Sequence, residues 1–253
     1  MRILLVIHGY PPYYMAGSEV YTYNLARELA KTNDVFVFHR IEDKDIPLHQ
    51  FFDSFEEGMH IRKINNYEPT PATFYDKYLN PEIDEAFREY VKKVNPDVVH
   101  IGHLSHLSTQ IPIIAKREFG LPVLFTIHDF WMFCHRGQLI NPQNWEICPL
   151  PNAAQCTKCA AFHYQKDDFE SRLIEERDEH IRQTLDCIDV FFAPSHTLEN
   201  FFINMGVDQR KIVYAKYGFN VSKLAKHSKE LHPEITFGFT GRIIHTKGVH
   251  LLC

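Results

Sequence analysis

Short apolar segments alternate with longer amphipathic segments along most of this chain, and this alternation restricts the fold more than any other feature. Strands are expected over residues 3–7, 35–38, 60–64, 98–101, 123–127, 190–193 and 212–214. Helices are expected over residues 18–31, 81–94, 107–118, 162–186 and 197–205. Near-continuous apolar strands that alternate with helices are typical of a parallel sheet with helices on both faces. The sequence therefore predicts an α/β fold built on a doubly wound parallel sheet.

Local signals refine the expected helices. The segment over residues 162–186 is crowded with charge, yet its apolar residues recur at spacings of three, four and seven, and these residues are Phe162, Phe169, Leu173, Ile174, Ile181, Leu185 and Ile188. This periodicity predicts one long helix with a core-facing side and a charged outer side. Elsewhere Pro81 suits a first helical position, and Ser18 and Ser195 can cap helices.

Composition places the chain among ordinary globular proteins. The 253 residues are 45% hydrophobic, which is ample for a packed core, and the formal net charge is −5. A net negative charge argues against a nucleic-acid binder, whose affinity depends on clustered Lys and Arg. The five consecutive apolar residues after Arg2 are too few for a signal peptide or a membrane span. We therefore expect a cytoplasmic protein, and peripheral contact with the inner face of a membrane stays open.

The loop after the first expected strand has features of an anion-binding loop. The stretch HGYPPYYMAGSEV contains Gly17 and Ser18, where a helix is expected to begin. The first N–H groups of a helix are exposed at the positive end of its dipole, where they attract phosphates. The tight G-x-G-x-x-G turn of dinucleotide-binding folds is missing, because ten residues separate this strand from its helix. A purely structural connection is the alternative.

Histidines follow two of the expected buried strands. They are His128, with Asp129 beside it, and the series His100, His103 and His106. Ligands of open α/β sheets bind in the crevice outside the carboxyl ends of the strands. A histidine in that position can donate a hydrogen bond to a sugar hydroxyl or respond to a developing charge. The alternative is a structural role, since 16 histidines bring some close together by chance.

The end of the chain has the pattern of a strand followed by a glycine-rich turn. Residues 235–240 alternate in polarity as in a strand, and Arg242 and Lys247 follow them. An Arg can bind a diphosphate through two parallel hydrogen bonds, and a Lys can add a movable charge. The polar, Lys-rich residues 219–234 suit a hinge before this segment. Ordinary surface charges are the alternative for both side chains.

Four of the six cysteines gather in a loop over residues 134–160. Cys134, Cys148, Cys156 and Cys159 are separated by thirteen, seven and two residues, so the last two form a C-x-x-C pair. The loop is rich in Pro, Asn and Gln and has little apolar content to fold around. These features predict a structural zinc site with four sulfur ligands, to which His135 could add another. An iron–sulfur cluster and free thiols are the alternatives.

Four stretches in sequence order resemble one family of enzymes. They are PPYYMAGSEVYTYNLARELA after the first strand, TIHD in the middle, YGFN, and GRIIHTKGVHLL at the end. In this order they resemble the retaining glycosyltransferases of the GT-B fold, a group that includes relatives of glycogen and sucrose synthases. The resemblance implies a Rossmann-like acceptor-side domain over residues 1–220. It also implies a hinge and the first strand of a nucleotide-sugar-binding domain over residues 221–253.

The resemblance assigns roles where positions match. Gly17 resembles the glycine that lets the backbone approach the donor diphosphate, although Ala16 stands where family members often have a second glycine. His128 resembles the histidine that contacts the transferred sugar near the reaction centre. Arg242 and Lys247 resemble the pair that neutralises the leaving diphosphate, which in this family usually replaces a catalytic metal ion.

The activity that the resemblance implies is transfer of a hexose from a nucleotide diphosphate sugar to a hydroxyl of a glycan or lipid-linked acceptor, with retention of anomeric configuration. His103 and Asp129 are then expected on the acceptor side. The family carries two glutamates in its second domain, further along than this chain extends, so little activity is expected from residues 1–253 alone. The alternatives are a non-catalytic GT-B-like binding module and a GT-B sugar-nucleotide epimerase.

Overall fold

The computed structural model describes residues 1–67, 73–218 and 235–252. The hinge predicted over residues 219–234 lies outside the described residues. The chain divides into two compact units, Met1–Gly218 and Phe219–Cys253, and each unit is described by itself.

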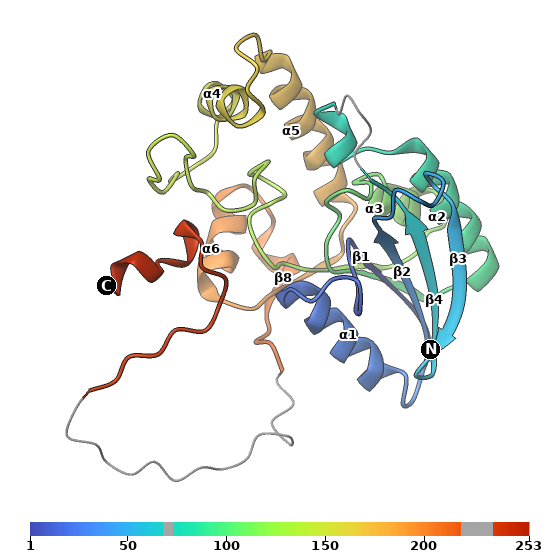
Figure 1. The fold of residues 1–253 in the computed structure, drawn as a ribbon. Coiled ribbons are helices and arrows are strands. Elements are labelled where there is room, and N and C mark those ends of the chain that lie inside the picture. Colours follow the sequence, from blue (N-terminus) through green and yellow to red (C-terminus); the bar gives the residue numbers. More distant parts are fainter. Residues whose placement is uncertain (68–72, 219–234, 253) are drawn as a thin grey trace. The chain divides into compact units, whose positions relative to one another are not determined.

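The first unit is built on an eight-stranded sheet in the order β3-β4-β2-β1-β5-β6-β7-β8 (Figure 1). The strands are β3 (Phe51–Glu56), β4 (Met59–Asn65), β2 (Asp34–Ile41), β1 (Arg2–Ile7), β5 (Val98–Ile101), β6 (Val123–Thr126), β7 (Val190–Ala193) and β8 (Ile212–Tyr214). All neighbouring strands run parallel except β3, which pairs antiparallel with β4. The predicted α/β class with a doubly wound parallel sheet is therefore confirmed.

Helices cover both faces of this sheet. They are α1 (Gly17–Leu29), α2 (Pro81–Val94), α3 (Ile111–Ile113), α4 (Ala153–Tyr164), α5 (Ser171–Asp186) and α6 (His196–Asn204). A π-helical segment, η2 (Ile114–Glu118), continues α3, and η1 (Tyr75–Lys77) and η3 (Gln209–Lys211) are short 3₁₀ turns. Leu4 and Val6 of β1 belong to a core that includes residues of α2, α3, α5 and α6. Ile3 and Leu5 belong to a second core with Ala26 of α1. Successive side chains of a strand point to opposite faces, which is why β1 is almost entirely apolar. None of the described helices is long and apolar enough to cross a membrane.

Strand β3, which is largely exposed at one end of the sheet, is not among the strands predicted from the sequence. Its sequence FFDSFE carries two acids and is therefore not a continuous apolar run. Glu57 and Gly58 connect it to β4 with left-handed φ values of 48° and 82°, as in a tight hairpin. Arg62 of β4 donates to both carboxylate oxygens of Asp53, at 2.7 and 2.8 Å. The signals for β3 are thus a turn and a cross-strand ion pair, which a search for apolar runs does not detect.

The single helix predicted over residues 162–186 is wrong, because two helices occupy this part of the chain. Helix α4 closes at Gln165, which adopts a left-handed φ of 54°, and α5 begins only at Ser171. Phe162 is 51% exposed and so lies outside the predicted stripe, whereas Ile174 of α5 is buried. The apolar stripe holds for α5 but does not extend through the break.

Two predicted helix starts are also wrong. The helix predicted over residues 107–118 begins at Ile111, because Pro112 has no N–H and its ring clashes with the carbonyl four residues earlier. Ser18 does not cap α1, which begins one residue earlier with Ala16 as an N-cap that makes no side-chain hydrogen bond. The other two signals are confirmed. Pro81 opens α2, and the Ser195 hydroxyl accepts from the N–H of Leu198 in α6.

In the second unit the described residues 235–252 contain no strand, so the strand predicted over residues 235–240 is wrong for this structure. Ile235 and Phe237 are 83% and 79% exposed. A strand needs a neighbour to pair its N–H and C=O groups, and these described residues provide none. Two short turns follow, η4 (His245–Lys247) and η5 (Val249–Leu251).

Candidate active site

Three histidines follow three strands at the point where the strand order reverses. β1 lies between β2 and β5, so later strands are added on both sides of it. Ligands of open α/β sheets bind at such a switch point, outside the carboxyl ends of the strands. His8 follows β1, His103 follows β5 and His128 follows β6. The histidine site is defined as His8, Glu19, His103, His128, Asp129 and Tyr217.

His8 and Glu19 form a largely buried pair between β1 and the first turn of α1. Nε2 of His8 lies 3.2 Å from Oε1 of Glu19, and the Ser18 hydroxyl donates to Oε2 at 2.9 Å. Burial, with a smaller contribution from His103, lowers the pKa of His8 to about 4. Burial opposes ionisation of Glu19, but hydrogen bonds from His8 and Ser18 outweigh it and lower the pKa of Glu19 to about 2. At neutral pH a neutral imidazole thus donates to an ionised carboxylate, which leaves Nδ1 of His8 as an acceptor.

His103 and Asp129 join the ends of β5 and β6. The N–H of Ser105 donates to Nδ1 of His103 at 3.1 Å, so Nδ1 is an acceptor and the ring N–H lies at Nε2. That Nε2 lies 3.4 Å from Oδ2 of Asp129, whose other oxygen accepts from the N–H of Trp131 at 2.8 Å. The centroid of the His103 ring lies 4.3 Å from that of His8. Asp129 therefore helps to hold His103 against His8.

The imidazole of His128 has one satisfied and one unsatisfied nitrogen. Nδ1 lies 2.6 Å from the hydroxyl of Tyr217, and burial raises the pKa of that phenol, so the hydroxyl stays protonated and donates. Burial, with a contribution from His103, lowers the pKa of His128 to about 3, so the ring is neutral with its proton on Nε2. Nε2 is buried and has no hydrogen-bond partner among the described residues. A buried N–H without an acceptor is costly, and each such group calls for an explanation.

The histidine site therefore offers both a donor and an acceptor to a ligand. Nδ1 of His8 is also buried and, within the described part of the chain, unpartnered. A ligand hydroxyl can accept from His128 or donate to His8, because it carries both functions. Neither imidazole is cationic at neutral pH. The site can thus orient a hydroxyl, but neither His8 nor His128 supplies positive charge for a phosphate.

Gly17, the predicted diphosphate residue, is the first residue of α1. A methyl group added there would meet no atom within 4 Å, so the backbone is open to approach. The N-cap residue Ala16 supplies no side-chain acceptor to the first N–H groups of the helix. The acid of this first turn is Glu19, which belongs to the histidine site.

Three other residues predicted from the sequence are His100, Arg242 and Lys247. His100 is buried, and its Nε2 lies 2.8 Å from the hydroxyl of Thr126, so this histidine joins β5 to β6. Arg242 and Lys247 are exposed residues of the second unit, and Lys247 is the last residue of η4. Their contact with a diphosphate stays a prediction.

Three members of the histidine site are not among the residues predicted from the sequence, and they are His8, Glu19 and Tyr217. His8 directly follows the first strand, so the rule that selected His128 applies to it equally. Glu19 could have been found as the acid in the first turn of a helix that begins after a strand-end loop. Tyr217 is the first residue of the YGFN stretch, which carries part of the family resemblance, but no local pattern predicts its contact with His128, 89 positions away.

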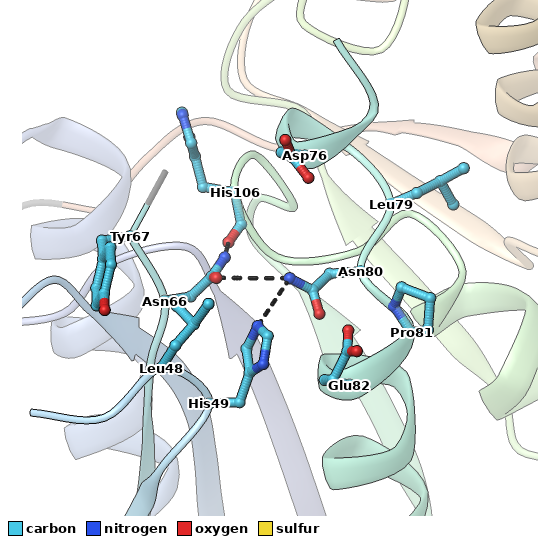
Figure 2. A pocket seen from close by; sticks show the side chains of 10 residues that line it. All are labelled: Leu48, His49, Asn66, Tyr67, Asp76, Leu79, Asn80, Pro81, Glu82 and His106. Atoms are coloured by element: carbon cyan, nitrogen blue, oxygen red, sulfur yellow. Dashed lines mark hydrogen bonds between the residues drawn. The ribbon is translucent and has the colours of Figure 1, made fainter. Parts of the chain in front are cut away.

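A separate polar pocket lies where the end of β4 meets the start of α2. It is lined by Leu48, His49, Asn66, Tyr67, Asp76, Leu79, Asn80, Pro81, Glu82 and His106 (Figure 2). Nδ2 of Asn80 lies 3.2 Å from Nε2 of His49, and Asn66 donates to the carbonyl of His106 at 2.6 Å (Figure 2). His49 and His106 have left-handed φ values of 64° and 58°, which are strained for residues other than glycine. Backbone strain of this kind clusters at ligand sites.

Arg40 connects the polar pocket to the histidine site. Its guanidinium donates to the carbonyl of His8 at 3.2 Å and to the carbonyl of Asn66 at 3.0 Å. A second link is Ser105, whose N–H donates to His103 and whose hydroxyl lies 2.9 Å from Nδ1 of His106. The polar pocket therefore adjoins the histidine site through two independent sets of contacts.

The four cysteines predicted as metal ligands line one small cavity, which is termed the thiol cavity. Its lining consists of Cys134, His135, Leu139, Ile140, Asn141, Cys148, Pro151, Gln155, Cys156 and Cys159. All four cysteines are free thiols. Among the residues that the structure describes, no group of three or more His, Cys, Asp or Glu side chains is arranged to hold a metal ion. The four cysteines thus line the same cavity without being arranged around a metal position, and zinc binding stays a prediction.

Several solved structures are similar in fold to this chain. HepE of Anabaena, solved with UDP, aligns with a TM-score of 0.43 and 12% identity over 87% of this chain and 45% of its own. The UDP-GlcNAc 2-epimerase of Methanocaldococcus jannaschii aligns with a TM-score of 0.42 and 11% identity over 85% and 45%. The α,α-trehalose-phosphate synthase of Burkholderia vietnamiensis aligns with a TM-score of 0.45 and 12% identity over 83% and 43%. The chain spans less than half the length of these proteins.

A family assignment comes from the sequence itself. No curated protein matches the chain. The family model described as Glycosyltransferase Family 4 matches residues 15–223, a segment that contains Gly17, His103, His128 and Tyr217. Since this match covers most of the 253 residues, the chain belongs to Glycosyltransferase Family 4.

Proposed function

We propose that this chain is the acceptor-side part of a glycosyltransferase that transfers a hexose from a nucleotide diphosphate sugar to an acceptor hydroxyl, with retention of anomeric configuration. Membership of Glycosyltransferase Family 4 supports the reaction class. The observation that carries the proposal is the buried, unpartnered Nε2 of His128 beside the polar groups of His103 and Asp129. A sugar hydroxyl would give that N–H the acceptor it lacks.

His128 is proposed to donate from Nε2 to the transferred sugar near its anomeric carbon. In glycosyl transfer, positive charge develops on the anomeric carbon while negative charge develops on the departing phosphate. A neutral imidazole adds no positive charge that would oppose the charge developing on the anomeric carbon. Because burial holds the pKa of His128 at about 3, the ring keeps that neutral state through the physiological pH range.

The donor diphosphate is proposed to approach the backbone at Gly17, where the dipole of α1 favours an anion. Ionised Glu19 lies in the same helical turn and opposes that anion, and the neutral His8 does not compensate for it. Cations from elsewhere are therefore required. We assign this role to Arg242 and Lys247 of the second unit, so that no catalytic metal ion is needed.

The polar pocket is proposed to bind the acceptor, with His103 and Asp129 facing the same substrate from the histidine site. Its carboxylates, Asp76 and Glu82, accept hydrogen bonds from hydroxyl groups and repel anions. The acceptor end is therefore expected to be an uncharged sugar of a glycan or of a lipid-linked saccharide. Arg40 joins this pocket to the histidine site, which places acceptor and donor sugar next to each other in this proposal.

The test is a transfer assay on the full natural protein, in which labelled nucleotide diphosphate sugars are screened against neutral glycans and lipid-linked sugars. His128→Ala is expected to lower kcat by about 100-fold, because it removes one positioned donor at the reacting centre. The matched control is His196→Ala, since His196 is an exposed histidine at the start of α6. This control is expected to keep both kcat and thermal unfolding unchanged.

Each remaining outcome argues against a specific part of the proposal. Unchanged turnover by His128→Ala would remove the assigned role of this histidine. A product with inverted configuration, read from the NMR coupling of its anomeric proton, would exclude retention. Epimerised donor in the absence of acceptor would identify an epimerase, and acceptor binding without any turnover would identify a binding module.

A further inference from the structure

The thiol cavity collects sulfur atoms from three separate segments. Cys134 lies in the loop after β6, Cys148 lies in the loop before α4, and Cys156 and Cys159 lie on α4 itself. Residues three positions apart on a helix share one face, and both α4 thiols line the cavity. The fold therefore brings together four cysteines that span 26 positions of the sequence, counted from 134 to 159.

His135 is an independent indication of a ligand. It lines the same cavity, and both of its ring nitrogens are buried without a hydrogen-bond partner among the described residues. An imidazole with neither nitrogen bonded is costly, because a buried polar group loses its hydrogen bonds to water. An acceptor in the thiol cavity, such as a thiolate, would give one nitrogen a partner.

The loop that carries Cys148 is not stabilised by a hydrophobic core. Trp145, Ile147 and Leu150 are 46%, 79% and 51% exposed. In the described structure the loop contains one isolated bridge, between Ile140 and Ile147, and no longer strand or helix. Segments with so few buried apolar contacts usually depend on a disulfide or a metal for order.

We propose that Cys134, Cys148, Cys156 and Cys159 bind one zinc ion as four thiolates. Zinc takes four sulfur ligands in a tetrahedron, and each thiol releases one proton to solvent as its bond to the metal forms. His135 then donates to one of the sulfur atoms rather than to the metal, as groups around metal ligands commonly do. The ion fixes the loop to the face of α4.

Two arginines are positioned to balance the charge of this site. One zinc ion with four thiolates carries two net negative charges. Arg177 of α5 is buried, and its charge interacts with Cys134 and Cys156. Arg136 interacts in the same way with Cys159 and also forms a hydrogen bond with it. Asp178 already lies 3.6 Å from the Arg177 guanidinium, and the thiolates would add further negative charge beside both arginines.

Metal binding requires the sulfur atoms to move closer together. No three potential ligands in the described part of the chain are yet arranged around a metal position. Cys156 and Cys159 are already one turn apart on α4. The exposed loop with Cys148 makes few buried contacts, so a shift of that loop onto the ion costs little free energy.

The test is metal analysis and spectroscopy of the purified chain, with zinc and then cobalt(II) as the probes. About one zinc ion per chain is expected. Cobalt is expected to give thiolate charge-transfer absorption and the intense visible bands of a tetrahedral site. Cys148→Ser and Cys156→Ser are each expected to weaken zinc binding by at least about 100-fold. The matched control is Cys187→Ser, because Cys187 is a buried thiol at the end of α5 that does not line the cavity.

Clear results would overturn the proposal. They include a chain that is folded by circular dichroism yet binds neither zinc nor cobalt, a pale six-coordinate cobalt spectrum, and an iron–sulfur chromophore in place of zinc. Equal losses of zinc affinity in Cys156→Ser and Cys187→Ser would overturn it as well. If the serine variants do not fold, the cobalt spectrum of the unaltered chain still decides the coordination. None of these measurements depends on transferase activity, so their failure would leave the proposed function unaffected.

Discussion

The histidine site and the thiol cavity lie at the two ends of one short segment, which runs from Asp129 to Cys134, yet they are built differently. In the histidine site the side chains follow strand ends and are held by directed hydrogen bonds, such as that from Ser105 to His103. In the thiol cavity the groups are carried by a loop and one short helix, and neither nitrogen of the His135 imidazole has a hydrogen-bond partner within the described residues.

This difference indicates when each site acquires its geometry. Side chains on rigid elements are positioned before a ligand arrives, and a ligand then changes the structure little. Side chains on a loop without a core are positioned by the ligand, so binding free energy becomes folding free energy. We therefore expect substrate binding at the histidine site to leave loop order unchanged, whereas zinc in the thiol cavity should order its loop.

Replacing Arg177 should remove hydrogen bonds to the segment that joins the histidine site to the thiol cavity. Of the changes considered, it should lower the free energy of unfolding the most. Its guanidinium donates to the carbonyls of Trp131 and Met132 at 2.5 and 3.3 Å, within the segment that joins the regions. Arg177→Met should lower the free energy of unfolding by about 3 kcal/mol, because it leaves buried carbonyls without donors. Urea denaturation measures this loss. Arg172→Met, on the exposed side of the same helix, should cost less than about 0.5 kcal/mol, and an equal cost would contradict this role of Arg177.

A change of pH should weaken the histidine site in a predictable direction. The pKa of His8 is about 4 in the folded chain against an ordinary value of 6.5, so the unfolded chain binds more protons between these pH values. Stability is therefore lost as the pH falls through this window. His8 alone should account for about 1 kcal/mol between pH 6.5 and pH 5.5.

The measurement compares urea denaturation of the chain and of His8→Gln at both pH values. A chelator is present throughout, because acid also displaces metal from thiolates. The variant should lose about 1 kcal/mol less than the chain over this interval. Parallel losses in the two proteins would show that His8 is not kept neutral by burial.

Removing the Tyr217 hydroxyl should show whether hydrogen bonds fix the side chains of the histidine site, because this hydroxyl holds the imidazole of His128. Tyr217→Phe removes the donor to Nδ1 of His128, so the imidazole proton is no longer confined to Nε2. We expect a loss of about 1 kcal/mol in stability and a mixture of tautomers in the nitrogen-15 NMR signals of His128. Tyr214→Phe is the control, because Tyr214 lies on β8 and stacks on His196. An unchanged tautomer in Tyr217→Phe would contradict the assigned hydrogen bond.

The smallest effect on stability is expected at Gly17. Gly17→Ala should change the free energy of unfolding by less than about 0.5 kcal/mol, because the new methyl group meets no atom within 4 Å. It should nevertheless raise the KM for the donor in the full natural protein if the diphosphate approaches this backbone. Gly102→Ala is a useful contrast, since its methyl group would lie 2.8 Å from a carbon of Ile7 and should destabilise the fold. An unchanged donor KM in Gly17→Ala would place the diphosphate elsewhere.

The parallel part of the sheet could be predicted because burial on both faces makes its strands continuously apolar. β3 could not be found in that way, since it alternates Phe51 and Phe55 with acids at an exposed edge. The break between α4 and α5 was missed because Gln165 adopts its left-handed conformation without a glycine or proline to mark it. In both cases the secondary structure is decided by tertiary contacts or by a single backbone angle, which the sequence pattern does not contain.

The candidate site was predictable only in part, for a related reason. His128 could be selected because its position follows from the end of one strand, and the same rule reaches His8. The contact with Tyr217 joins residues 89 positions apart, so no local pattern contains it. Arg177 looks like part of the charged outer side of its helix, yet it is 2% exposed and supports the segment between the two regions. Contacts of this kind depend on the complete fold.

The antiparallel strand β3 also has a consequence for how copies of this protein behave at high concentration. An unpaired strand edge is a template on which another chain can add a strand and begin an aggregate. Here that edge is short and carries Asp53 and Glu56, and Asp53 is held by the guanidinium of Arg62. A second copy that approached this edge would have to bury those charges. Although Phe55 is 65% exposed beside these charges, β3 therefore ends the sheet and disfavours the addition of a strand from another chain.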